Sequence, residues 1–377
     1  MKNLKNKSLI TCFCFLIYLP IIDQLLGISS FRTMENRPSF VAENGAIHSM
    51  RTLKKAVRQF DVYYKTNFGI RDGLVFLHSV LHYYVLNDSP IPQQVIFGKQ
   101  GWLYVGDHYN RVMQQHQGLW PLSVDSAQAI AQHLVAVQQK LAGKGAQLYI
   151  LIAPDSHSIY PEYLPDYVAS GYHAQTKEHY QWTETPHDVL SQVMQKHLSV
   201  PFLDLRDTLC RAKQKAVIYR QTDTHWSNYG ALIGTASIIN RIRQTFPSIR
   251  PVQWNDYDMQ VMRGGSGDLA ALMMLQGQVK DQIFYSIVSK PAFRTVAAQQ
   301  SAERQTSVFQ GKNAGQPSML LFGDSFSESM LVYLPGYFSR TCAVRQPALD
   351  WQRIDQEKPD IVIVEIVERN LRDLRKL

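Results

Sequence analysis

Two short motifs hold residue types that can act together in nucleophilic catalysis. In segment 320–327 (LLFGDSFS), Ser325 follows an apolar run and a glycine; in segment 222–227 (TDTHWS), Asp223 stands two residues before His225. A serine hydroxyl is a weak nucleophile that needs a base, and histidine serves best near neutral pH. An aspartate can hold the imidazole in the right tautomer. The motifs therefore predict a catalytic triad with Ser325 as nucleophile, His225 as base and Asp223 as orienting carboxylate.

Each motif also has a simpler interpretation. Ser325 or Ser327 could be only the N-cap of a following helix. An Asp-x-His sequence could be a surface turn or half of a metal site, for which Asp155 and His157 are the additional candidate ligands. A metal site needs more ligands, and no cysteine or third histidine has a suitable spacing. We therefore predict neither a metal nor a cofactor.

Helices and apolar runs alternate along the part of the chain that must position these motifs. Segment 147–153 (QLYILIA) is short and wholly apolar, as expected of a strand in a parallel sheet covered on both faces. Further elements are predicted as strands at 201–205, 318–322 and 360–367, helices at 126–142, 186–198 and 227–246, and a hairpin at 94–105. The alternation predicts a three-layer α/β fold with a mostly parallel central sheet. Both motifs can then reach one edge of the sheet.

The N-terminus has the pattern of a membrane anchor. Lys2, Lys5 and Lys7 precede an apolar run at 9–26, which as a helix would span roughly 27 Å, close to the thickness of the bilayer core. Lysines before the span predict a cytoplasmic N-terminus and an exported remainder. No good cleavage site follows, so an uncleaved anchor in the inner membrane is favoured over a cleaved signal peptide. We expect the rest of the chain to lie in the periplasm.

We predict an anchor helix at residues 1–30, a juxtamembrane helical segment at 31–93 and a catalytic domain at 94–377. The chain has a formal charge of +8. Basic residues would favour anionic lipid or an acidic polysaccharide as partner, although scattering for solubility explains them equally well. Nucleic acid is not an expected partner, because no basic run with interleaved aromatic residues is present.

Two cysteines, Cys210 and Cys342, lie in the part predicted to be exported. They could form one disulfide in an oxidising compartment, or both could be free and buried. The sequence does not decide between these two states.

Together the two motifs resemble the alginate O-acetyltransferase family (AlgJ/AlgX type) of the SGNH hydrolase superfamily. In that family the Asp-x-His-Trp element precedes the Gly-Asp-Ser-aromatic-Ser element, the reverse of the order in ordinary SGNH esterases. Other segments that resemble family elements are Glu35–Arg37, Phe68–Arg71, Gly98–Tyr104, Gly267–Leu269 and Val364–Arg369. The resemblance covers about residues 30–370 and implies an SGNH-like fold with a permuted motif order.

The resemblance implies transfer of acetyl groups to an exported polysaccharide such as alginate, through an acetyl-serine at Ser325. A membrane-bound O-acyltransferase would supply the acetyl group. Two alternatives stay open: an acetylesterase that uses the same triad, and a non-catalytic subunit of a polysaccharide export complex. The intact Ser–His–Asp set speaks against the second alternative.

Several further residues are expected to support the site. Trp226 is interpreted as a packing wall under the histidine rather than a sugar platform. The backbone N–H of Ser325, with Arg263 or Arg369 nearby, is expected to form the oxyanion hole. Glu365 and Arg369 are interpreted as a structural ion pair or as support for the site.

Overall fold

The computed structural model describes residues 2–26, 49–169, 184–291, 293, 295, 297–301 and 305–377. The chain divides into two compact units, one formed by residues 1–90 with 273–275 and the other by 91–272 with 276–377. The domain limits drawn from the sequence at residues 30 and 93 stay predictions. The segment Glu35–Arg37 lies outside the described residues.

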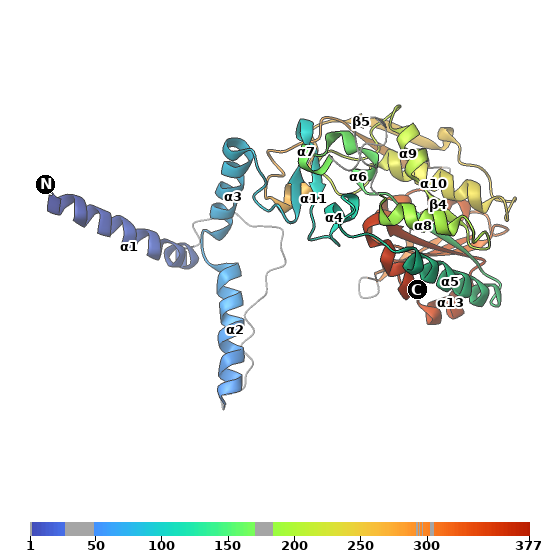
Figure 1. The fold of residues 1–377 in the computed structure, drawn as a ribbon, viewed down its shortest axis with the longest axis horizontal. Coiled ribbons are helices and arrows are strands. Elements are labelled where there is room, and N and C mark those ends of the chain that lie inside the picture. The colour runs from blue at the N-terminus through green and yellow to red at the C-terminus, as the bar shows by residue number, and fades with distance from the viewer. Residues whose placement is uncertain are drawn as a thin grey trace. The chain divides into compact units, whose positions relative to one another are not determined.

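The first unit is helical (Figure 1). Its elements are α1 (Lys2–Leu26), α2 (Met50–Asn67), α3 (Arg71–Leu81) and a π-helical turn at His82–Leu86. Large apolar side chains of α1 are exposed, among them Leu9, Phe13 and Leu16. In the part of the chain that the structure describes, no helix is both long enough and apolar enough to cross a membrane. The membrane anchor therefore stays a prediction.

The second unit is built on a seven-stranded sheet. Its strands, in spatial order, are β4 (Phe202–Asp204), β3 (Gln147–Ala153), β11 (Ile361–Val367), β9 (Ser318–Phe322), β10 (Arg340–Val344), β8 (Thr306–Gln310) and β7 (Ala297–Ser301). The first five are parallel to one another, whereas β8 and β7 are antiparallel to their neighbours. The prediction of a mostly parallel sheet is confirmed.

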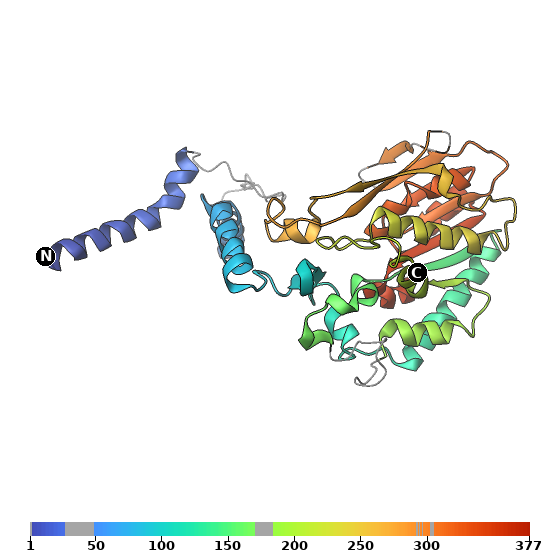
Figure 2. The same cartoon turned by 90° about the horizontal axis from the view of Figure 1, so that it is seen from above.

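Helices cover both faces of this sheet. Alternate residues of the central strands, such as Ile150 of β3 and Val364 of β11, form one core with α5 (Val124–Ala142) and α8 (Pro186–Met194). On the other face lies α10 (Asn228–Ile242), as the two views in Figures 1 and 2 show. Strands buried on both faces explain the continuous apolar runs in the sequence. The three-layer α/β architecture is confirmed.

Two antiparallel hairpins accompany the sheet. The predicted hairpin is present as β1 (Val95–Phe97) and β2 (Leu103–Val105), and Trp102 and Tyr104 are buried in it. A second hairpin, β5 (Tyr257–Met262) with β6 (Phe284–Ser289), was not predicted. Neither were β7, β8 and β10 of the main sheet.

Candidate active site

Ser325 stands where the parallel strand β9 gives way to α12 (Ser325–Met330). Asp324 caps this helix, because its carboxylate accepts from the backbone N–H of Phe326 at 3.0 Å and from that of Val367 at 2.8 Å. Gly323 is required at the turn, since a Cβ there would lie 2.6 Å from the side chain of Ser327. The turn therefore holds Ser325 at the carboxyl edge of the sheet.

Asp223 and His225 lie in the segment that enters α10, whose N-cap is Ser227. The buried Trp226 joins this segment to the serine helix, because its Nε1–H donates to the carbonyl of Phe326 at 3.1 Å. The ring of Phe326 lies 5.0 Å from that of His225. Trp226 packs on Phe326, with 5.5 Å between the ring centres, and so helps to bring the two motifs together. Its role as a wall under the histidine stays a prediction.

The two motifs meet in a triad geometry. His225 Nε2 lies 2.8 Å from Ser325 Oγ, and His225 Nδ1 lies 2.9 Å from Asp223 Oδ1. Asp223 Oδ1 also accepts from the backbone N–H of His225 at 2.9 Å. With Nδ1–H donating to Asp223, Nε2 can accept the serine proton. The structure therefore brings Ser325, His225 and Asp223 together over a hundred residues of sequence.

The charges around His225 suit a base that must become cationic. Burial lowers the pKa of His225, but the hydrogen bond to Asp223 and the nearby carboxylate of Asp268 outweigh burial, so the pKa is raised. The pKa of Asp223 is lowered. Burial alone would raise it, but the hydrogen bonds from His225 outweigh the effect of burial. Asp223 is therefore ionised at neutral pH and stabilises the imidazolium.

Asp268 is a second carboxylate at the histidine that sequence reasoning did not assign a role. Its Oδ2 lies 3.5 Å from His225 Nδ1, and its Oδ1 accepts from the backbone N–H of Thr224 at 2.7 Å. Burial, and then the charge of Asp223, raise the pKa of Asp268. The resemblance of Gly267–Leu269 to a family element was the available signal. Its proximity to His225 depends on the fold.

A buried ion pair fixes the segment that carries the triad aspartate. Arg220 Nη2 lies 2.6 Å from Asp281, and Asp281 accepts from the backbone N–H and the hydroxyl of Thr222 at 3.0 and 2.8 Å. The hydroxyl of Thr222 in turn accepts from the backbone N–H of Gly267 at 2.7 Å. These contacts hold the segments of Asp223 and Asp268 against each other.

The predicted pairing of Glu365 with Arg369 is wrong. The guanidinium and backbone N–H of Arg369 bind Asp155, which follows β3. Glu365 accepts from the backbone N–H of Asp324 at 3.2 Å, and burial raises its pKa well above the ordinary range. Burial therefore favours the neutral form of Glu365 beneath the serine turn.

The two arginines expected near the oxyanion hole differ in position. Arg369 is buried, and its guanidinium lies 5.6 Å from the centre of the Phe326 ring, on the helix of Ser325. Arg263 is exposed, and no hydrogen bond or ion pair among the described residues joins it to the triad. The backbone N–H of Ser325 has no hydrogen-bond partner in the described part of the chain, so it can stabilise an oxyanion.

This geometry is matched by a known family. Residues 95–344 fit the family described as SGNH hydrolase-like domain, acetyltransferase AlgX. The chain belongs to this family. Its fold is accordingly SGNH-like, and the family is that of an SGNH-type acetyltransferase.

Relatives and solved structures agree with this assignment. The proteins named probable alginate O-acetylase AlgJ from Pseudomonas aeruginosa and Pseudomonas syringae are each 25% identical to this chain, over 306 and 302 residues. Each alignment covers 80% of this chain, and it covers 68% and 66% of the respective relative. The structure of Bacillus cereus PatB1 shares the fold, with a TM-score of 0.53, 16% identity, and coverage of 75% of this chain and 98% of that one.

Two groups of described side chains lie close enough to hold a metal ion: Asp223, His225 and Asp268, and His116, Asp155 and Glu368. The first group is the triad with its second carboxylate, where hydrogen bonds explain the arrangement. In the second group, Asp155 pairs with Arg369, and Glu368 pairs with His187 at 3.0 Å. His157, predicted beside Asp155 as a candidate ligand, instead places its Nε2 3.2 Å from the carbonyl of Val105. We therefore assign hydrogen-bonding roles to both groups.

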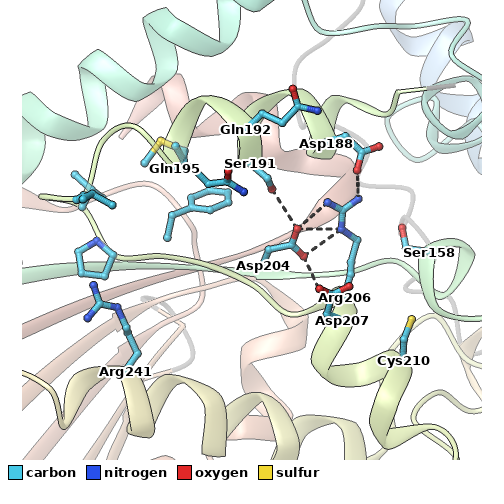
Figure 3. Close-up of a pocket in the computed structure, with 15 residues that line it drawn as sticks. Ser158, Asp188, Ser191, Gln192, Gln195, Asp204, Arg206, Asp207, Cys210 and Arg241 are labelled. Carbon is cyan, nitrogen blue, oxygen red and sulfur yellow. Dashed lines mark hydrogen bonds and ion pairs between the residues drawn. The ribbon is translucent and has the colours of Figure 1, made fainter. Parts of the chain in front are cut away.

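A hollow of about 630 Å³ lies away from the triad, at the edge strand β4. Figure 3 shows Arg206 in this hollow, paired with Asp188 and Asp204. No triad residue lines it. Cys210 lines this hollow, whereas Cys342 is buried in the core. Both are free thiols, so they do not form a disulfide with each other.

Proposed function

We propose that this protein is an O-acetyltransferase that acetylates hydroxyl groups of an exported, alginate-like polysaccharide. The observation that carries the proposal is the hydrogen-bonded chain from Ser325 through His225 to Asp223 in a member of an acetyltransferase family. The names of the curated relatives, probable alginate O-acetylases, support alginate as the model acceptor.

The reaction proceeds in two steps on Ser325. In the first, Ser325 Oγ attacks the carbonyl carbon of the acetyl donor while its proton passes to His225 Nε2, and the donor's leaving group takes that proton. In the second, a sugar hydroxyl gives its proton to His225 and attacks the acetyl-serine, and Ser325 Oγ recovers the proton. The backbone N–H of Ser325 stabilises both oxyanions; such a donor is typically worth about 2.7–4 kcal/mol.

The setting proposed for this reaction is the periplasmic side of the inner membrane. The lysines in the first two turns of α1 and the exposed apolar side chains that follow them support an N-terminal anchor. A membrane-bound O-acyltransferase is the proposed acetyl donor, and an anchor would keep Ser325 close to it. Extraction of cell membranes at alkaline pH tests the anchor: an anchored chain stays in the pellet, and release into the supernatant would contradict it.

A serine-to-alanine exchange tests the reaction. Ser325→Ala should abolish both the covalent acetyl adduct and polymer acetylation by the purified protein supplied with a small acetyl ester and alginate. Ser327→Ala is the matched control, because the hydroxyl of Ser327 donates to the carbonyl of Asp324 and does not contact His225. Mass mapping of the serine peptide detects the adduct, and acetylated polymer is measured against free acetate.

Two outcomes would contradict the proposal. Free acetate without acetylated polymer would identify an acetylesterase that uses the same triad. Unchanged polymer acetylation in Ser325→Ala would show that the triad does not perform the reaction.

A further inference from the structure

A polar cavity of about 450 Å³ adjoins the strand that leads to Ser325. It is formed by the start of β8, the end of β10 and the beginning of α13 (Trp351–Glu357). The side chains that define it, here called the arginine–glutamine cavity, are Arg345, Arg353, Gln305, Gln346, Gln352 and Gln356. None of these residues takes part in the triad or its supporting contacts.

The cavity lies at the same edge of the sheet as the nucleophile. Val344 of β10 pairs in register with Phe322 of β9, and its carbonyl accepts from the backbone N–H of Gly323 at 3.1 Å. Arg345 Nε lies 2.8 Å from Glu328 Oε1, and Glu328 belongs to the helix that begins at Ser325. The cavity is thus connected to the serine helix through the Arg345–Glu328 pair and to the serine turn through Val344.

The chemistry of the lining suits an acidic sugar. Among the described lining residues, Asp350 is the one carboxylate, and it already accepts from the backbone N–H of Arg353 at 3.0 Å. Two guanidinium groups thus outnumber it, and guanidinium groups bind carboxylates in a bidentate fashion. The four glutamine amides each offer donors and an acceptor to sugar hydroxyls. A uronate residue carries both kinds of group.

Both arginines can bind a substrate carboxylate through their guanidinium groups. The Arg345–Glu328 pair is half-exposed, with 50% and 51% of the two side chains accessible, and exposed pairs of this kind contribute little to stability. Arg353 lies 3.8 Å from Glu357, a carboxylate that already binds Arg340 at 2.9 Å. A sugar carboxylate would therefore replace an exposed contact at Arg345 and a long contact of 3.8 Å at Arg353, whose side chain is 17% exposed.

We propose that the arginine–glutamine cavity is an acceptor subsite that binds a uronate residue of the polymer, a few sugars away from the hydroxyl that is acetylated. This inference rests on the proposed function and adds selectivity for an anionic polymer. The carboxylate binds Arg345 and Arg353, and the glutamines contact the hydroxyls.

Removal of both guanidinium groups tests the subsite. The double variant Arg345→Gln/Arg353→Gln should raise KM for alginate about tenfold or more and leave kcat nearly unchanged, since charged hydrogen bonds to the acceptor are lost. Hydrolysis of a small acetyl ester should stay at the wild-type rate, because the triad is intact. Arg211→Gln on α9 (Arg206–Ala212), beside the opposite edge strand β4, is the matched control for a lost surface charge.

Direct binding separates this inference from the transferase proposal. Calorimetry should show that a mannuronate oligosaccharide binds the wild type, binds the double variant about tenfold more weakly, and binds less tightly as salt rises. Such a result supports the subsite even if no polymer is acetylated. Equal binding to wild type and double variant, no binding to the wild type, or equal binding of a neutral glucan oligosaccharide would overturn it.

Discussion

His225 is the residue on which the proposed chemistry depends, because its two ring nitrogens face different partners. Nε2 faces the serine oxygen, while Nδ1 faces Asp223 at 2.9 Å and Asp268 at 3.5 Å. Burial lowers the pKa of His225, but the two carboxylates outweigh burial and raise it. Because the base must be neutral to accept a proton, activity should fall as pH drops through this raised pKa.

We expect Asp268→Asn to move the acid limb of the kcat/KM profile to lower pH. The exchange removes a negative charge that favours the imidazolium, so the pKa of His225 falls and the neutral base persists at lower pH. The plateau rate should stay within about tenfold of wild type, whereas Asp223→Asn should cost on the order of 10⁴-fold. The pH profile of ester hydrolysis measures both effects.

The control for this exchange is Asp258→Asn, which removes an exposed carboxylate on β5. It should leave the acid limb in place. An acid limb that stays fixed in Asp268→Asn, or moves to higher pH, would contradict the role assigned to Asp268.

Among single residues, sequence reasoning succeeded where local motifs carry the chemistry. Ser325, His225 and Asp223 were predicted because their types and spacing are informative by themselves. An ion pair between Glu365 and Arg369 was one of two interpretations, and it is wrong: Glu365 lies within β11 and Arg369 within the following 3-10 helix, and each has a different partner. Arg369 meets Asp155 across the edge of the sheet, which no local pattern reveals.

At the scale of elements, β3, β4, β9 and β11 of the main sheet were predicted, whereas β10, β8 and β7 of that sheet and the β5–β6 hairpin were not. β3, β9 and β11 are nearly wholly buried and therefore read as continuous apolar runs. β5 alternates apolar and polar residues from Tyr257 to Val261, but it is short, and of its residues only Tyr257 is buried. Its pairing with β6 is a long-range contact that no local sequence pattern predicts.

The close approach of two segments at Gly267 gives a prediction at this scale. A Cβ at this position would lie 2.4 Å from the Asp223 Cβ and 2.4 Å from the Thr222 carbonyl oxygen. Gly267→Ala should therefore push Asp223 away from His225, lower kcat about 10²-fold and lower the free energy of unfolding by about 1–3 kcal/mol. Ester hydrolysis and chemical denaturation measure the two effects.

Gly277 offers the matched control, because a Cβ added there would meet no atom within 4 Å. Gly277→Ala should change the free energy of unfolding by no more than about 0.5 kcal/mol. Wild-type activity in Gly267→Ala would show that the two segments are not packed as tightly as the structure indicates.

For the molecule as a whole, stability against pH depends on two buried glutamates that differ in charge. Burial would raise the pKa of Glu368, but the charge and hydrogen bond of His187 outweigh it, so the pKa lies well below the ordinary range. Glu368 also accepts from the backbone N–H of Asp155 at 2.8 Å and from the Ser158 hydroxyl at 2.6 Å. Glu368 thus joins the segments after β3 and β11 to α8. Glu365 differs, because burial raises its pKa.

The two glutamates should respond to amidation in opposite ways. The pKa of Glu368 is lowered on folding, so its contribution to stability is full above about pH 4.5 and is lost as pH falls below that value. Glu368→Gln should therefore destabilise the fold by about 3–5 kcal/mol at pH 7 and by less in acid. The pKa of Glu365 is raised, so Glu365→Gln should be neutral or stabilising at pH 7, increasingly so as pH rises.

Denaturant unfolding of both variants across pH checks this pair of predictions. Each variant serves as the control for the other, because the exchange is chemically the same and both positions are buried. A larger loss of stability in Glu365→Gln than in Glu368→Gln at pH 7 would contradict the assigned charges.

The position of β11 has a consequence for how the enzyme matures. This strand is the last described strand along the sequence, yet it lies between β3 and β9 and forms the backbone hydrogen bonds that join them. Until β11 has joined the sheet, the centre of the sheet has a gap, and the serine turn lacks the Val367 amide that braces Asp324. The proposed acetyl transfer would therefore begin only after β11 has inserted between β3 and β9.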